Sequence, residues 1–215
     1  MQILIFGDSI AHGIWDNNGG WVARLRKFIN SKLMDDDFYC LLYNLGVDGD
    51  STKDLLKRME PEILSRRKEA DTMIIISLGG RDAVIDMATQ QTYTSYREFE
   101  ENIRKLIDIA RKYTGNIVFI GPVGPRDESK TNPIAWMPGH AASNKVIREF
   151  NSIEKRVCKE KGVDFIDVFS KLEKLDYKSL LEDGIHPNTK GHKKLFSIIR
   201  SYLMRNELIK RKRTD

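Results

Sequence analysis

Short apolar runs of strand length recur along the chain, and helical periodicity fills most of the sequence between and after them. The runs cover 3–6, 38–45, 72–78, 116–121 and 163–168, and the expected helices cover 20–34, 51–68, 95–113, 143–161 and 188–206. Continuous apolar strands that alternate with helices are typical of a parallel sheet covered on both faces. A chain of 215 residues is long enough to bury such a sheet without a disulfide or a metal ion. We therefore predict one α/β domain, a three-layer α/β/α sandwich with a five-stranded parallel sheet.

The cysteines, the start of the chain and the distribution of charge predict where the protein is located and what it does not bind. Cys40 and Cys158 lie far apart in apolar or helical segments, so we expect buried free thiols rather than a zinc site or a redox pair. Free thiols suit a reducing cytoplasm, and the apolar start "ILIF" is far shorter than a signal sequence or a membrane span. The net charge of +5 comes largely from the chain end, where "RNELIKRKRTD" holds five basic and two acidic residues. We expect a cytoplasmic protein with one domain over 1–206, a solvated basic tail over 207–215 and no nucleic-acid partner.

A serine stands directly after the first apolar run, in "FGDSIAHG". Open α/β sheets bind their ligands at the carboxyl ends of the strands, which is where Ser9 is expected. Serine is a weak nucleophile at neutral pH, so it requires a base, a group that orients the base, and donors for the oxyanion. Asp8 has a simpler reading, in which it only holds the turn beside Ser9.

The candidate base is one of four histidines. His186 lies in "EDGIHPNTKGH", just before the last helix, and Asp183 precedes it by three residues. An Asp-x-x-His turn alone is typical of a cap with a surface histidine, but together with Ser9 it indicates a base and its orienting carboxylate. We expect the other three histidines to be structural rather than catalytic. His12 is expected in a loop, His140 at the end of the irregular stretch 122–142, and His192 on the surface of the last helix.

At this point the chain resembles the GDSL esterase/lipase family, also called the SGNH hydrolases. Four family blocks occur in order: "GDSI" at 7–10, "NLGVDGDST" at 44–52, "LGGRDA" at 78–83 and "DGIHP" at 183–187. The resemblance implies a sheet of flavodoxin-like strand order 2-1-3-4-5. It also implies that Ser9 is the nucleophile, that His186 is the general base, and that Asp183 orients His186. The amides of Ser9 and Gly49 form the implied oxyanion hole, and no metal or organic cofactor is implied. Without the other blocks, Gly49 reads as an ordinary turn glycine.

The third block departs from the family pattern. Where the family has Gly-x-Asn-Asp, with the asparagine donating to the oxyanion, this chain has Arg81 before Asp82. Either Arg81 donates to the oxyanion or to an anionic substrate group, or it turns away and pairs with Asp82 or another acid. The second possibility leaves two oxyanion donors, and one lost donor typically costs ~10²–10³ in rate.

We predict a serine esterase that hydrolyses a small or short-chain carboxylic ester, since no long apolar lid is visible. The alternatives are a carbohydrate O-acetyl esterase and a non-catalytic binding protein with an anion site at Arg81. A nucleotide-binding flavodoxin-like module is disfavoured, because "GDSIAHG" lacks a phosphate-binding glycine pattern. The stretch 122–142 is expected over the rim that holds Ser9, as a pocket wall. Other candidate substrate contacts are Trp15, Trp21, Trp136, Arg126 and Lys130, although packing explains a tryptophan more often.

Overall fold

The computed structural model describes residues 1–33, 39–67, 71–125, 132–175 and 177–209. Its main sheet has five parallel strands in the order β2-β1-β3-β5-β8. Counted along the chain, this is the order 2-1-3-4-5, and the predicted sandwich and strand order are confirmed. The strands are β1 (Gln2–Gly7), β2 (Leu41–Gly46), β3 (Thr72–Ser77), β5 (Asn116–Ile120) and β8 (Asp164–Ile166).

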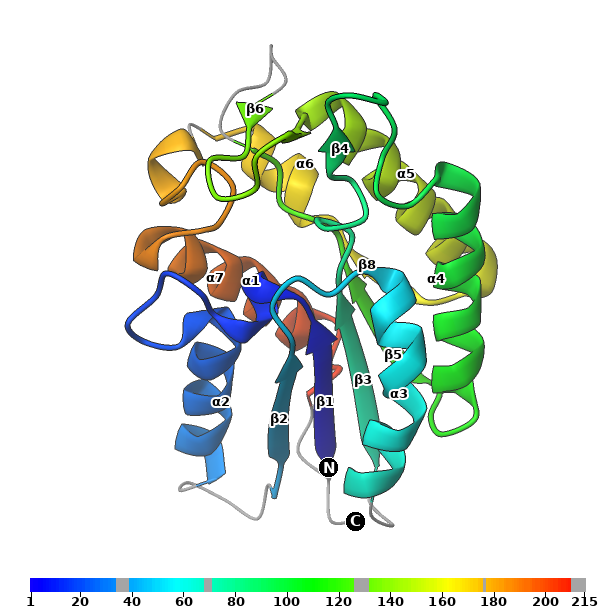
Figure 1. Cartoon of the computed structure of the whole chain (residues 1–215). Coiled ribbons are helices and arrows are strands. Elements are labelled where there is room, and N and C mark those ends of the chain that lie inside the picture. Colours follow the sequence, from blue (N-terminus) through cyan, green and yellow to red (C-terminus); the bar gives the residue numbers. More distant parts are fainter. Residues whose placement is uncertain (34–38, 68–70, 126–131, 176, 210–215) are drawn as a thin grey trace.

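Helices cover both faces of this sheet (Figure 1). On β1, Ile3 and Ile5 pack in one apolar cluster with α2 and α7, whereas Leu4 and Phe6 pack in a second cluster with α3, α4 and α5. Successive side chains of a strand point to opposite faces, so a strand buried on both faces is apolar throughout. The long helices are α2 (Gly20–Leu33), α3 (Thr52–Arg66), α4 (Tyr96–Arg111), α5 (Asn144–Lys161) and α7 (Thr189–Arg205).

Three neighbouring strands, β2, β1 and β3, end at one level. Gly7 is in register with Gly46 of β2 and with Ser77 of β3, so the loops that follow them share the carboxyl rim. The short helix α1 (Ser9–His12) begins immediately above β1. The chain therefore places Ser9 at the rim, as expected.

A small antiparallel sheet stands above this rim. It consists of β4 (Ile85–Asp86), β7 (His140–Ala142) and β6 (Asn132–Pro133), in that order. The stretch 122–142 was expected to be irregular, but two of these short strands lie within it, closed by a hydrogen bond of 2.9 Å from the Ile134 amide to the His140 carbonyl. Its residues 126–131, including Arg126 and Lys130, lie outside the described residues.

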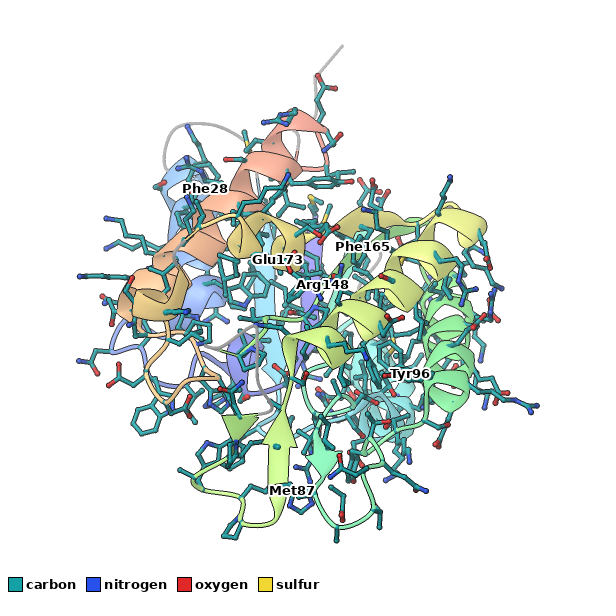
Figure 2. All side chains as sticks on the ribbon, turned by 90° about the horizontal axis from the view of Figure 1, so that it is seen from above. Phe28, Met87, Tyr96, Arg148, Phe165 and Glu173 are labelled. Carbon is teal, nitrogen blue, oxygen red and sulfur yellow. The ribbon has the colours of Figure 1, made fainter. Side chains whose placement is uncertain are left out.

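Two short elements connect β8 to the last helix: α6 (Val168–Glu173) and the 3₁₀ helix η1 (Tyr177–Leu180). Arg148 of α5 forms an ion pair with Glu173 of α6, near the middle of the view down onto the rim (Figure 2). In that view Phe28 marks the α2 side of the molecule and Tyr96 the α4 side.

Both cysteines are buried and unpaired, as expected. Within the described residues, no helix combines the length and the apolar character needed to cross a bilayer. The end of the expected tail, 210–215, lies outside the described residues. The division into a domain and a tail stays a prediction.

Candidate active site

The turn that carries Ser9 is held by its own backbone and by Asp8. Asp8 Oδ1 accepts a hydrogen bond from the Ile10 amide at 2.9 Å and caps α1. Gly13, with φ of 102°, ends the helix, and its amide donates to the Ser9 carbonyl at 2.9 Å. A Cβ at Gly7 would stand 2.5 Å from the Ala11 Cβ, so only glycine allows α1 to fold back this closely over β1.

Asp8 is buried and holds this turn, which is the structural role that the sequence suggests for it. Burial raises its pKa to about 6, against the lowering effect of the Ile10 amide. The turn thus contains a carboxyl group that gains a proton under mildly acidic conditions.

The structure brings Ser9, His186 and Asp183 together. Ser9 Oγ lies 3.0 Å from His186 Nε2, and His186 Nδ1 lies 2.7 Å from Asp183 Oδ2. With the Nδ1 proton donated to Asp183, Nε2 is free to accept from the serine hydroxyl. This is the geometry that a nucleophile, a base and an orienting acid require.

The turn around His186 is closed by hydrogen bonds of its own. The amides of Ile185 and His186 donate to Asp183 Oδ1 at 3.0 and 2.8 Å. The Glu182 amide donates to the His186 carbonyl at 2.9 Å, and the Asn188 side chain then caps α7. Burial tends to raise the pKa of Asp183, but the hydrogen bonds from the His186 side chain and amide outweigh it and hold this pKa well below its usual value.

Ser9 and His186 face a cavity of about 110 Å³. Most of the other residues that line it are apolar, and several belong to the stretch 122–142, which confirms this stretch as a pocket wall. These apolar residues are Ile10, Val84, Val123, Pro125, Ile134, Trp136, Ala142, Ile147 and Ile185. The cavity therefore suits a small group of low polarity.

Gly49 lines the same cavity, in the turn after β2. Its φ is 75°, a conformation that favours glycine, while a Cβ there would meet nothing within 4 Å. Glycine is thus required by the backbone conformation rather than by lack of space. Within the described residues, neither the Ser9 amide nor the Gly49 amide has a hydrogen-bond acceptor.

Arg81 also lines the cavity, but its guanidinium group is held from the side. The group lies 4.4 Å from the centre of the Tyr93 ring, and Nη1 is 2.8 Å from Met137 Sδ. Asp82 does not pair with it: this buried carboxylate accepts from the Thr52 amide at 3.0 Å and the Thr52 hydroxyl at 2.6 Å. In the described part of the chain, Arg81 has no carboxylate partner. Its guanidinium group is therefore an unneutralised cation at the cavity wall.

The assignment of His192 to the surface is wrong. His192 is fully buried between α7 and the loop before α2: Nδ1 accepts from the Trp21 amide at 3.3 Å, and Nε2 lies 3.0 Å from the Ile14 carbonyl. Burial lowers its pKa. His12 is exposed at the end of α1, and His140 lies on β7.

Trp136 lines the cavity, as expected, and both Trp136 and Trp15 contact Asp183. Trp15 Nε1 and Trp136 Nε1 donate to Asp183 Oδ2 at 3.3 and 3.2 Å, while Trp21 is in the core. No spacing in the sequence indicates these contacts, because the partners lie 168 and 47 positions apart. No group of three or more His, Cys, Asp or Glu side chains among the described residues is arranged to hold a metal ion.

Comparison with known proteins agrees with this geometry. The sequence model of the family described as "GDSL-like Lipase/Acylhydrolase family" matches residues 5–194. A Bos taurus protein named isoamyl acetate-hydrolyzing esterase 1 homolog is 25% identical over 205 residues, which are 91% of this chain and 78% of that protein. An acetylxylan esterase of Xylanibacter ruminicola is 28% identical over 137 residues, 59% of this chain and 27% of that protein. The crystal structure of a lipase/acylhydrolase from Enterococcus faecalis superposes with a TM-score of 0.71 at 22% identity, over 94% of both chains.

Proposed function

Because the chain belongs to the GDSL-like lipase/acylhydrolase family and is a serine hydrolase that acts on esters, we propose that it hydrolyses short-chain carboxylic esters through an acyl-enzyme on Ser9. The observation that carries this proposal is the pair of contacts Ser9 Oγ–His186 Nε2 and His186 Nδ1–Asp183 Oδ2, at 3.0 and 2.7 Å, beside the cavity.

In the proposed reaction, Ser9 Oγ attacks the ester carbonyl while His186 Nε2 takes the hydroxyl proton. The carbonyl oxygen becomes an oxyanion that accepts from the amides of Ser9 and Gly49. The bond to the alcohol then breaks, and His186 returns the proton to the alcohol oxygen. Water next attacks the acyl-enzyme with His186 as base, which releases the acid and restores Ser9. Asp183 stabilises the imidazolium ion in both steps.

Arg81 is assigned to the cavity wall rather than to the oxyanion hole. Its contacts with Tyr93 and Met137 support this assignment, because they hold the guanidinium group by its face and by one nitrogen. The hole then consists of two amides, one donor fewer than the family pattern provides. This predicts catalysis that is weaker than with an asparagine at position 81.

The lining of the cavity supports a short, apolar substrate group over a sugar. A sugar requires several polar partners for its hydroxyl groups, whereas nine of the lining residues are apolar. The similarity to proteins named for isoamyl acetate hydrolysis points the same way. A carbohydrate O-acetyl esterase, to which the acetylxylan esterase similarity points, is the less favoured substrate class.

The test is a series of neutral p-nitrophenyl esters from acetate to dodecanoate, with acetylated xylose beside them. We expect kcat/KM to be highest for short chains and to fall for long ones, and Ser9→Ala to abolish turnover of every ester. The matched control is Ser31→Ala, since Ser31 is exposed on α2 and its hydroxyl donates to the Phe28 carbonyl of the same helix. Preference for acetylated xylose would shift the substrate class to carbohydrates, and full turnover by Ser9→Ala would overturn the mechanism.

A further inference from the structure

Two indole N–H groups converge on one oxygen of Asp183. Trp15 comes from the loop between α1 and α2, and Trp136 comes from the hairpin that joins β6 and β7. Their Nε1 atoms lie 3.3 and 3.2 Å from Asp183 Oδ2, which also receives His186 Nδ1 at 2.7 Å. Oδ1 meanwhile accepts the amides of Ile185 and His186. The carboxylate thus has five donors, three of them on the oxygen that faces the imidazole.

Apolar burial does not explain the position of either tryptophan. Trp15 and Trp136 are 53% and 54% exposed, although a tryptophan ring stabilises a fold mainly by leaving water. What both rings share is the direction of the indole N–H. Their common contact with Asp183 therefore explains their placement better than packing does.

Trp15 is held in an unfavourable backbone conformation. Its φ is 62°, which is rare for a bulky residue and persists only where the surroundings enforce it. The loop is fixed on both sides of Trp15: the Ile14 carbonyl contacts buried His192, and Asp16 pairs with Arg24 and accepts from the Thr189 hydroxyl at 3.1 Å. Such strain is a reason to look for a function at this residue.

Trp136 joins the substrate cavity to the same carboxylate. Its ring centre lies 5.6 Å from that of His186, with 32° between the planes, and the residue lines the cavity. One side chain therefore contacts the imidazole by its face, Asp183 by its N–H, and the space for the ester.

We infer that Trp15 and Trp136 are positioning residues that act through Asp183, an inference that rests on the proposed esterase mechanism. The two N–H groups fix the carboxylate in the orientation that receives His186 Nδ1–H. They also draw negative charge away from Oδ2. The Asp183 side chain lies at an open rim, where water competes for this oxygen. Asp183 thereby stays ionised beside His186.

The test uses Trp15→Phe and Trp136→Phe, which keep an aromatic ring and remove the N–H. Since both rings are mostly exposed, the variants should fold. We expect kcat to fall about tenfold for Trp136→Phe and a few-fold for Trp15→Phe, with KM nearly unchanged, as for the loss of a hydrogen bond to a charged group. Tyr39→Phe, an exposed ring just before β2 and at the opposite end of the sheet, is the control.

A double-mutant cycle with Asp183→Asn separates this role from a substrate contact. If the indoles act through Asp183, Trp136→Phe costs little more in the Asp183→Asn background. An equal loss in both backgrounds, or a change confined to KM, would overturn the inference. The far-downfield proton resonance of His186 Nδ1–H supplies a readout without turnover: it should shift in both tryptophan variants and stay in place in Tyr39→Phe. A wild-type protein without any Ser9-dependent hydrolysis would instead count against the proposed function.

Discussion

The two turns that carry the candidate site differ in where the donors to their carboxylates come from. The nucleophile turn, residues 7–13, is buried and is held by contacts within itself: a side-chain cap, a left-handed glycine and a close approach at Gly7. The histidine turn, residues 181–188, stands at the open rim, and its carboxylate takes donors from two distant loops. Both turns therefore have local hydrogen bonds, but the carboxylate of the histidine turn gains two further donors only when the distant loops pack over the rim.

The carboxyl groups of the two turns show the same contrast in their acidity. Burial raises the pKa of Asp8 to about 6. At Asp183 burial acts in the same direction, but the hydrogen bonds from His186 prevail and lower the pKa. The balance between burial and the donors to each carboxyl group thus moves the pKa values of the two aspartates in opposite directions.

The largest expected effect lies in the histidine turn. His186→Ala removes the proposed base, so we expect kcat to fall by about 10⁶-fold, as when a member of a serine triad is lost. Combining it with Ser9→Ala should cost little more, because the two groups act as a unit. Turnover of p-nitrophenyl acetate by the single and double variants measures this. Additive losses would mean that the two turns act independently.

The next effect concerns the stability of the nucleophile turn. The pKa of Asp8 is about 6 in the fold, against 3.8 as the ordinary value, so the folded state binds more protons between these limits. The free energy of unfolding should then fall as pH rises from about 4 to about 6, by about 3 kcal/mol in total. Asp8→Asn keeps an oxygen for the Ile10 amide and should remove this slope.

Urea unfolding of both proteins at several pH values measures the difference between the two slopes. Other groups titrate equally in wild type and variant and cancel in that difference. Asp108→Asn on α4, at an exposed ion pair with Lys161, controls for the Asp-to-Asn change itself. A slope that persists in Asp8→Asn would mean that the nucleophile turn does not hold a protonated carboxyl group.

The smallest expected effect lies between the two turns, at Arg81. Arg81→Asn restores the family's third donor beside the oxyanion, so we expect kcat for neutral short esters to rise about tenfold, below the ~10²–10³ that one donor is typically worth. Ester turnover by Arg81→Asn, with Arg81→Gln as a longer amide, measures it. A sharp fall in kcat for Arg81→Asn would show instead that the guanidinium group contacts the reacting ester.

The sequence predicts best what depends on neighbours along the chain. Alternating apolar and helical segments predicted the sandwich, and the blocks around Ser9 and His186 predicted which side chains meet. The contacts of Asp183 with Trp15 and Trp136 were not predictable, because they depend on how two loops pack over the rim. His192 was misassigned for the same reason: its helix was recognised, but the loop that covers it lies some 170 residues earlier in the chain. The sequence leaves the partner of Arg81 open, since only the folded structure brings its guanidinium group over the Tyr93 ring.

The central claim is that the two turns together activate Ser9. Treatment with a fluorophosphonate ester, followed by mass spectrometry of the digested protein, tests it most directly. We predict one modified residue, Ser9, with full labelling of the wild-type protein, none of Ser9→Ala, and much slower labelling of His186→Ala. Label on a different serine, or an unmodified Ser9 in a protein that still hydrolyses short esters, would contradict it.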